Sequence, residues 1–170
     1  MCKNELLEAL SGAEAPFLVM SVGVPGSGKS TVLSELSDKI GVVRINPDQI
    51  RRELTGSEDD QSRNPEVWNE VFRRAKEYLG RGESVIIDAT HAEIRIGVPS
   101  RSELVEMYRG FGAKTVLAIY FKVRLETAKK RNQGRTRVVP DHVIERMYMA
   151  LEEKLVSVGE GFDQIIEVNE

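Results

Sequence analysis

A glycine-rich stretch near the N-terminus carries the residues with the clearest chemical meaning. Residues 23–30 read G-V-P-G-S-G-K-S, which fits the pattern G-x-x-x-x-G-K-[ST] of phosphate-binding loops. Its glycines let backbone N–H groups turn inward around phosphates, and a following helix presents its positive N-terminus to the same charge. The apolar run at 17–22 and the helical spacing after the loop supply the strand–loop–helix context that confirms the pattern. We expect this stretch to bind ATP, or another nucleoside triphosphate, together with Mg²⁺.

Two residues of this loop have specific expected roles. Lys29 is expected to reach the β and γ phosphates, and the Ser30 hydroxyl to be a ligand of Mg²⁺. The expected nucleotide-binding residues of the loop are Gly23, Pro25, Gly26, Ser27, Gly28, Lys29, Ser30 and Thr31. Switch-type NTPases and motors share such a loop, but they are usually longer or carry motifs such as N-K-x-D, which this sequence lacks. A short chain with arginines late in its sequence favours a phosphoryl-transfer enzyme.

Asp48 and Arg51 follow the second short apolar run, at 42–45. The end of that run should lie at the carboxyl edge of the sheet, near the phosphate loop. A carboxylate there can accept the proton of an attacking hydroxyl. Arg51, one helical turn later, could hold an anionic group of the acceptor. The alternative is that Asp48 only caps a helix and pairs with Arg51.

Asp88 ends the apolar run at 84–88, the position of a Walker B acid. We expect it to hold Mg²⁺ through water or to contact the acceptor, rather than merely to cap the strand. His91 is a lone histidine in a loop, a setting in which the ring is usually solvated. Trp68 is expected to belong to the core rather than to form a base-stacking platform.

The segment 124–137 holds six basic residues against one acid. Arginines on a closing segment stabilise the charge of a transferring phosphoryl group and exclude water. Arg131 and Arg135 are four residues apart, and Gly134 between them can end a helix. The alternative is a solvated basic helix face.

Alternating apolar and helical patterns define the elements that must position these residues. Strands are predicted at 17–22, 42–45, 84–88, 115–121 and 164–168. Helices are predicted at 3–12, 29–39, 48–54, 65–79, 101–108, 125–132 and 142–155. The polar, acidic stretch 55–64 is expected to be a mobile loop. This order predicts an α/β P-loop NTPase fold: a doubly wound, mainly parallel five-stranded sheet with helices on both faces and an arginine-bearing lid.

Length and composition bound the remaining possibilities. The 170 residues fit an N-terminal helical extension at 1–16 and a single kinase domain at 17–170. No apolar run approaches a membrane span and the N-terminus lacks a secretory pattern, so we expect a cytoplasmic protein without membrane partners. The one cysteine, Cys2, excludes a disulfide framework within the chain. A net charge of −3 argues against polyanion binding over the whole surface but allows a local basic channel.

With these residues in place, the chain resembles the kinase domain of the polynucleotide 5′-kinases, both the bacteriophage enzyme and bacterial end-healing repair kinases. The resemblance covers about residues 17–155. It rests on G-x-P-G-S-G-K-S-T at 23–31, x-x-D-x-x-R ending at Arg51, I-I-D-A-T, and K-R-N-Q-G-R-T-R-V-V-P at 130–140. The phosphate loop is shared by a superfamily, whereas the last motif, followed by a helix with Met147-Tyr148, is more specific.

The resemblance implies a role for each matching residue. Asp48 would be the general base that activates a 5′-hydroxyl, and Arg51 would contact the acceptor phosphate. Lys29 and Arg135 would bind the donor phosphates, Arg131 the donor nucleotide, and Ser30 the Mg²⁺. His91 departs from the phage pattern, which has Asn, and the phosphatase or ligase modules often fused to these kinases do not fit into 170 residues.

Three functions follow from this reading. The leading hypothesis is ATP-dependent phosphorylation of the 5′-hydroxyl of DNA or RNA. A small-molecule kinase, acting on a sugar, antibiotic or nucleoside, would keep the same loop, base and lid. A channel of basic side chains leading away from Asp48 would favour nucleic acid over a small molecule. The third possibility is a module that hydrolyses or senses NTP within a complex, which would release phosphate without an acceptor.

Overall fold

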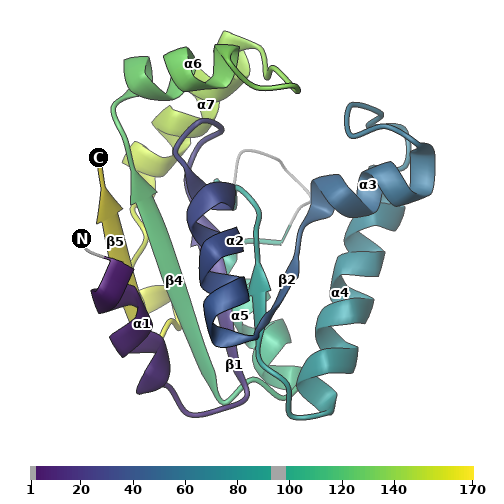
Figure 1. Ribbon diagram of the computed structural model, residues 1–170, viewed down its shortest axis with the longest axis vertical. Coiled ribbons are helices and arrows are strands. Elements are labelled where there is room, and N and C mark those ends of the chain that lie inside the picture. The colour runs from purple at the N-terminus through teal and green to yellow at the C-terminus, as the bar shows by residue number, and fades with distance from the viewer. Residues whose placement is uncertain (1–2, 93–98) are drawn as a thin grey trace.

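The computed structural model describes residues 3–92 and 99–170 (Figure 1). Its centre is one five-stranded sheet in the order β2-β3-β1-β4-β5, and every neighbouring pair is parallel. The strands are β1 (Phe17–Val22), β2 (Val43–Ile45), β3 (Val85–Ile87), β4 (Thr115–Lys122) and β5 (Gln164–Asn169). This architecture confirms the predicted fold class, and the sheet is wholly rather than mainly parallel.

The inner strands are buried on both sides of the sheet. All six residues of β1 and all three of β3 are buried, as are the central six residues of β4. Continuous runs of apolar side chains suit this position, because a parallel sheet is covered by helices on both faces. The strand order changes direction at β1, so a crevice is expected beside the carboxyl end of this strand.

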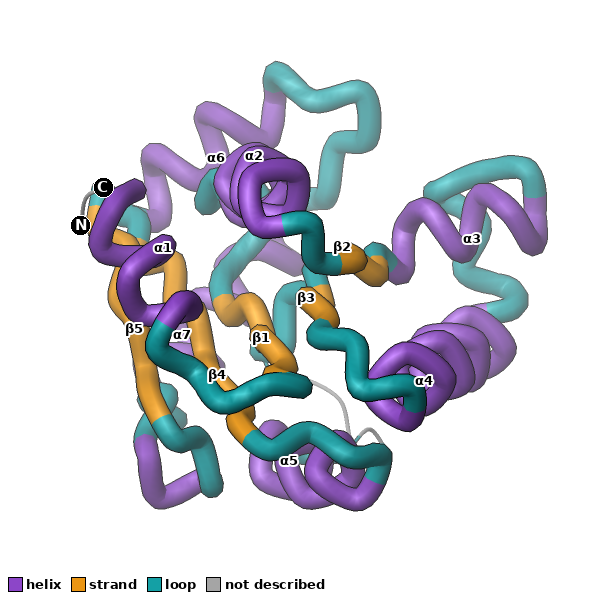
Figure 2. The backbone as a smooth tube through the Cα atoms, turned by 60° about the horizontal axis from the view of Figure 1, so that its bottom comes forward, coloured by secondary structure: helices purple, strands orange, loops and turns teal. Residues whose placement is uncertain are grey.

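Helices pack on both faces of the sheet (Figure 2). The helices are α1 (Lys3–Ser11), α2 (Lys29–Ile40), α3 (Pro47–Thr55), α4 (Asn64–Gly80), α5 (Arg101–Gly110), α6 (Leu125–Gln133) and α7 (Asp141–Glu153). Leu6 of α1 and Leu33 of α2 share one apolar cluster with Val19 of β1. Val71 of α4 and Tyr108 of α5 join the cluster of the other face. The two separate clusters explain why the chain can hold helices on both sides of a single sheet.

The predicted elements are all present, with bounds that differ by at most two residues. A short 3₁₀ helix, η1 (Val158–Glu160), was not predicted, because three residues carry too little periodicity to be recognised. The acidic stretch predicted as a loop at 55–64 connects α3 to α4. Its first and last residues, Thr55 and Asn64, belong to those two helices.

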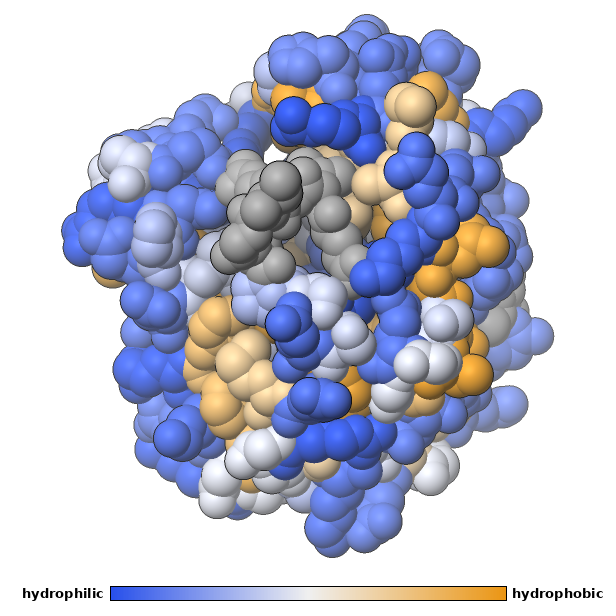
Figure 3. Space-filling model, turned by 180° about the vertical axis from the view of Figure 1, so that it is seen from behind, coloured by the Kyte–Doolittle hydropathy of each residue, from blue (hydrophilic) through white to orange (hydrophobic). Residues whose placement is uncertain are grey.

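The surface seen from behind the sheet is mostly hydrophilic, with smaller hydrophobic areas between charged groups (Figure 3). Within residues 3–92 and 99–170, no helix combines the length and apolar character needed to cross a membrane. Among the described residues, the exposed large hydrophobic side chains are Val138, Met149, Leu155 and Val158.

Candidate functional site

A pocket of about 950 Å³ lies at the edge of the sheet where the parallel strands end. Its walls come from the phosphate-binding loop, from α3 and α4, and from residues 124–140, which we call the lid. In Figure 1, α6 of the lid lies above one side of the sheet and α3 above the other. The predicted site residues in its lining are Pro25, Gly26, Gly28, Lys29, Ser30, Thr31, Asp48, Arg51, Asp88, Arg131 and Arg135. The fold therefore gathers most of the predicted site into one cavity.

The phosphate-binding loop packs closely against the lid. Gly26 has φ +82°, and a Cβ atom at this position would lie 2.2 Å from the carbonyl oxygen of Ala128 in α6. Gly28, with φ +92°, precedes the first residue of α2. Side chains are disfavoured at such φ values, and at Gly26 there is also no space for one. The loop can therefore contact α6 directly only with glycine at position 26.

Lys29 is buried beneath this loop. Its Nζ donates hydrogen bonds to the carbonyl oxygens of Gly23 (2.8 Å) and Val24 (2.9 Å), and it lies 3.4 Å from Oγ of Ser27. Burial lowers the pKa of the Lys29 ammonium to about 8, while the nearby Asp88 carboxylate opposes this shift. Gly23 and Ser27, predicted to bind nucleotide, are not among the residues that line the pocket, and both contact Lys29.

Asp88 follows β3 and is almost fully buried at the bottom of the pocket. Its Oδ2 accepts hydrogen bonds from Arg44 Nη1 at 2.7 Å and from Asn46 Nδ2 at 2.9 Å. Arg44 was not predicted to be near the site. The sequence did show that Arg44 is a charged residue inside an otherwise apolar strand, β2. The strand that lies beside β2 could not be identified before the strand order was known.

The residues near Asp88 offer suitable ligands for Mg²⁺. Ser30 supplies a hydroxyl and Asp88 a carboxylate, and both line the same pocket as Lys29. Across the described parts of the chain, no three His, Cys, Asp or Glu residues form a metal-binding group. Mg²⁺ in nucleotide enzymes is usually held by one or two carboxylates together with substrate phosphates and water, so this sparse donor set fits that ion.

Asp48 does not cap α3, because Asn46 does. The Asn46 side-chain oxygen accepts hydrogen bonds from the backbone N–H groups of Asp48 (2.8 Å) and Gln49 (3.2 Å). The carboxylate of Asp48 instead points to two guanidinium groups: its Oδ1 accepts from Nη1 of Arg51 and from Nη1 of Arg137, the latter at 2.6 Å. The capping alternative for Asp48 is therefore wrong, while its pairing with Arg51 is present.

Arg51 is held firmly by its surroundings. Its side chain is 6% exposed, and it reaches the Glu58 carbonyl oxygen at 3.4 Å and the Asn64 side-chain oxygen at 3.0 Å in addition to Asp48. Its buried Nε has no hydrogen-bond partner in the described part of the chain. Arg51 lines the pocket, but most of its donors already bind protein atoms.

The lid is tied together at its base by Asn132. This buried side chain donates to the Val139 carbonyl oxygen at 2.7 Å and accepts from the Val139 N–H at 3.1 Å, which closes the loop after α6. Helix α6 ends at Gln133, one residue beyond its predicted end, and Gly134 is its C-cap. Arg131 and Arg135 are exposed residues of the pocket wall.

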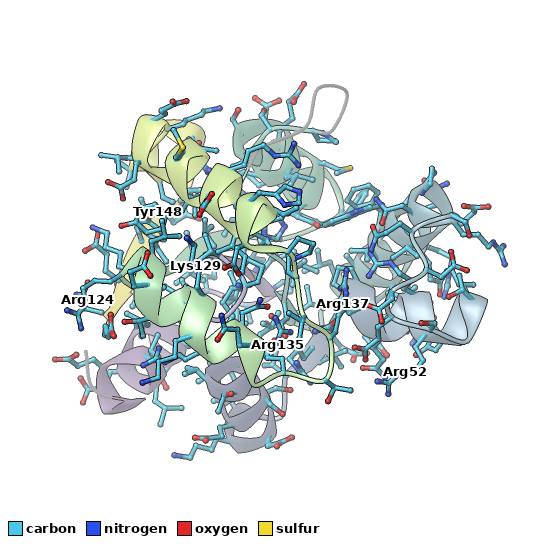
Figure 4. All side chains as sticks on the ribbon, turned by 90° about the horizontal axis from the view of Figure 1, so that it is seen from above. Arg52, Arg124, Lys129, Arg135, Arg137 and Tyr148 are labelled. Carbon is cyan, nitrogen blue, oxygen red and sulfur yellow. The ribbon has the colours of Figure 1, made fainter. Side chains whose placement is uncertain are left out.

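Arg137 is the lid residue that reaches the opposite wall. Its Nη1 contacts Asp48 at 2.6 Å and its Nε contacts Asp59, in the loop between α3 and α4, at 3.1 Å. Figure 4 shows Arg137 on the part of the lid that faces α3. The sequence placed Arg137 in a basic segment but assigned it no role, because its partners lie far away along the chain.

His91 is partly buried in the wall of the pocket rather than solvated, contrary to the prediction. It adopts φ +47°, and its Nδ1 lies 2.7 Å from the carbonyl oxygen of Ser21. Since a carbonyl can only accept, Nδ1 carries the proton of the neutral ring and Nε2 is an acceptor. Nε2 is shielded from solvent and has no partner within residues 3–92 and 99–170. Burial lowers the pKa of His91 to about 4.

Trp68 belongs both to the core and to the pocket. It packs partly against the cluster of α4 and α5, as predicted, and it also lines the cavity beside Phe72 at a ring-centroid distance of 5.8 Å. Arg101, which sequence reasoning missed, is fully buried in the same wall and binds Glu160 at 2.8 Å. This ion pair fixes α5 to η1 at the back of the pocket.

Comparison with known proteins agrees with this geometry. A family model described as an AAA domain matches residues 18–154. A chain of the Pnkp1/Rnl/Hen1 RNA repair complex is 26% identical over 88% of this chain, with a TM-score of 0.72. The match covers 47% of that longer chain, so the present chain spans about half of its length.

Two further structures share the fold at lower identity. A gluconokinase from Sinorhizobium meliloti 1021 is 19% identical with a TM-score of 0.57, and the match covers 92% of this chain and 83% of the other. A shikimate kinase from Bacteroides thetaiotaomicron is 16% identical with a TM-score of 0.58, covering 89% and 86% respectively. The chain thus belongs to the AAA domain family, and it shares the fold of the P-loop kinases.

Proposed function

We propose that this domain is a kinase that transfers the γ-phosphate of ATP to the 5′-hydroxyl of DNA or RNA. The observation that carries the proposal is the arrangement of Asp48. The guanidinium groups of Arg51 and Arg137 both donate to its Oδ1. Its Oδ2 accepts no hydrogen bond from the described residues. The carboxylate is therefore oriented by one oxygen and has the other available for a substrate proton, in the same pocket as Lys29.

In the proposed reaction the acceptor hydroxyl oxygen forms a bond to the γ-phosphorus as the bond between this phosphorus and the bridging oxygen of ADP breaks. The hydroxyl proton passes to Asp48. Lys29 and Arg135 bind the donor phosphates and stabilise the charge that spreads over the transferring group. Arg131 contacts the donor nucleotide, and Arg51 lies beside the acceptor.

Ser30 and Asp88 are the residues that would hold Mg²⁺. When bound with ATP, this ion neutralises phosphate charge and helps to orient the γ-phosphoryl group. Asp88 is itself oriented by Arg44 and Asn46, which leaves its other oxygen, Oδ1, without a hydrogen bond from the described residues.

The charge of the pocket supports a nucleic acid acceptor. Its described lining contains more cationic side chains than carboxylates, namely Lys29, Arg51, Arg101, Arg131, Arg135 and Arg137 against Asp48, Asp59 and Asp88. Trp68 and Phe72 add aromatic surface to the same wall, and single-stranded nucleic acids bind grooves that combine cationic and aromatic side chains. The 26% identity to a chain of an RNA repair complex points in the same direction.

A small-molecule acceptor is the second candidate. Arg101 is fully buried against Glu160, and the guanidinium groups that contact Asp48 are those of Arg51 and Arg137. Much of the remaining wall is apolar, including Leu104 and Met147. A compact acceptor with few charges, such as a sugar or nucleoside, would also fit such a cavity.

The test is transfer of labelled γ-phosphate from ATP with Mg²⁺ to short 5′-hydroxyl DNA and RNA oligonucleotides. We expect label at the 5′ end and a loss of about 10²–10⁴-fold in kcat for Asp48→Asn. Binding of ATP by this variant should stay within a few-fold of the wild-type value.

Two results would overturn the proposal. Transfer to sugars or nucleosides, without transfer to oligonucleotides, would identify the second candidate. Phosphate release without any acceptor would instead favour an NTP-hydrolysing module. If Asp48→Asn transfers label as fast as the wild type, Asp48 is not the base.

A further inference from the structure

Arg137 joins the lid to the opposite wall of the pocket. Its ion-pair partners are Asp48 in the first turn of α3 and Asp59 in residues 56–63, the stretch between α3 and α4 that we call the acidic loop. All three side chains line the pocket. Among the described residues, no other lid side chain forms a hydrogen bond or ion pair with α3, α4 or the acidic loop. The polar contact between the two walls therefore depends on one guanidinium group.

The acidic loop supports Asp59 from within. Its neighbour Glu58 accepts a hydrogen bond from Arg52 with its carboxylate, and another from Arg51 Nη1 with its carbonyl oxygen at 3.4 Å. The side-chain oxygen of Ser57 accepts from the backbone N–H of Asp59 at 3.2 Å. Because these contacts tie the loop to α3, the Asp59 carboxylate is presented to the lid by a supported segment.

The two carboxylates that bind Arg137 differ in their other contacts. Asp48 also binds Arg51 and is the proposed base. The side chain of Asp59 is 73% exposed, and within the described parts of the chain its carboxylate forms no ion pair besides the one with Arg137 at 3.1 Å. Loss of the Asp59 charge would therefore loosen the lid and leave the pairing of Asp48 with Arg51 in place.

We propose that the ion pair between Arg137 and Asp59 is a latch that holds the lid closed and limits the entry of the acceptor. Both partners belong to the chain itself, so the latch needs no ligand in order to close. Because Arg137 spans the gap between the two walls, the lid must release the acidic loop before an acceptor reaches Asp48. The latch itself is independent of the reaction, whereas its effect on the acceptor rests on the proposed function.

The strength of the latch determines how often the lid opens. Asp59 is largely exposed, and ion pairs of this kind shift an equilibrium by only about 1.5- to 5-fold. An acceptor that enters only the open form binds in proportion to the population of that form. Removal of the Asp59 charge should therefore raise the open population, and with it the reaction rate at low acceptor concentration, by this modest factor.

Limited trypsin digestion of the protein without ATP measures the latch directly. Cleavage after Arg137 requires its guanidinium to leave both carboxylates, so the rate follows the open population. We expect Asp59→Asn to be cut there about 1.5- to 5-fold faster than the wild type. Cleavage after Arg124, which is 85% exposed at the start of the lid, is the internal reference and should not change. Added salt should speed cleavage after Arg137 more in the wild type than in the variant.

Asp60→Asn is the matched control. It removes the same charge from the adjacent position, where the Asp60 carboxylate accepts a hydrogen bond from the Ser62 N–H within the acidic loop at 2.9 Å and does not contact the lid. This variant should be cut after Arg137 at the wild-type rate. Equal cleavage of all three proteins, or equal acceleration in both variants, would overturn the latch.

Phosphate transfer to a 5′-hydroxyl oligonucleotide measures the consequence for acceptor entry. We expect kcat/KM for the oligonucleotide to rise in Asp59→Asn by the same factor as the cleavage rate, and to stay at the wild-type value in Asp60→Asn. Faster cleavage without a rise of kcat/KM would overturn the limit on entry. If no protein transfers phosphate to nucleic acid while Asp59→Asn is still cut faster, the latch stands and the proposed function falls. If transfer occurs but cleavage is unchanged, the latch falls and the proposed function stands.

Discussion

The ammonium group of Lys29 donates a hydrogen bond of 2.8 Å to the carbonyl oxygen of Gly23, the residue that begins the phosphate-binding loop. Burial lowers the pKa of Lys29 to about 8, and the nearby Arg135 adds to this effect against the opposing Asp88. The group expected to bind the donor phosphates therefore loses its proton only slightly above neutral pH.

Nucleotide affinity should depend on pH through Lys29. We expect the Kd of ATP to be lowest below about pH 8 and to rise above it, because the neutral amine no longer attracts phosphate. Lys29→Met should bind ATP weakly and with little pH dependence over the same range. Fluorescence titrations between about pH 7 and 9.5 measure both curves. A wild-type Kd that stays constant over this range would contradict the prediction.

The stability of the protein without ATP should increase with pH, whereas its affinity for ATP should decrease. An unfolded lysine keeps its proton up to about pH 10.5, whereas Lys29 in the folded protein loses it near 8. Between these values the unfolded state binds more protons, so the contribution of Lys29 to the free energy of unfolding rises with pH. Denaturation curves of the wild type should show this rise relative to Lys29→Met.

Gly26 and Gly28 allow a matched test of the contact between the phosphate loop and α6. Both have positive φ, but only at Gly26 would an added Cβ meet the Ala128 carbonyl, whereas the space beside Gly28 is open to 4 Å. We expect Gly28→Ala to lower the free energy of unfolding by about 1–2 kcal/mol, the cost of the left-handed conformation. Gly26→Ala should lose about 1–3 kcal/mol more through overpacking.

Denaturant unfolding measures the loss of stability in each variant, and the rate of trypsin digestion measures how accessible the lid is. Displacement of α6 in Gly26→Ala should speed cleavage after Arg135 and Arg137, while Gly28→Ala should be cut at the wild-type rate. Equal stability losses and equal cleavage in the two variants would mean that the loop does not depend on its contact with α6.

The elements and the phosphate loop were predictable because their signals are local. Strand β1, the glycine pattern and α2 occupy consecutive residues, and the period of apolar side chains distinguishes strand from helix. Asp48 and Asp88 could be placed because the carboxyl ends of parallel strands share one edge of the sheet. Each of these inferences needs only the neighbouring sequence and a general rule of topology.

The arginines that bind those carboxylates could not be predicted, because they lie far from them along the chain. Arg137 meets Asp48 across 89 positions of sequence, and Arg44 meets Asp88 across 44. Such pairings depend on the strand order and on how the lid lies over α3, which no local pattern encodes. His91 was misjudged for a related reason: its ring contacts Ser21 of β1 and Trp68 of α4, which are distant along the chain.

His91 should make the protein less stable in mild acid. An unfolded histidine gains a proton near pH 6.5, whereas burial keeps His91 neutral in the folded protein down to about pH 4. Between these values the unfolded state binds more protons, so the free energy of unfolding falls as the pH decreases through this window. At about 1.4 kcal/mol for each pH unit, the loss approaches roughly 3 kcal/mol at its lower end.

The variant His91→Asn tests this origin of acid sensitivity. Asparagine does not titrate, tolerates the positive φ of position 91 and can donate a hydrogen bond to Ser21. Denaturant unfolding between about pH 4.5 and 7 should show a smaller loss of stability for this variant than for the wild type. His142, exposed on α7, provides the control, since His142→Asn should retain the wild-type profile. If the wild type and His91→Asn lose stability in parallel, the proton uptake of His91 does not govern the acid response, and the carboxylates paired with arginine become its source.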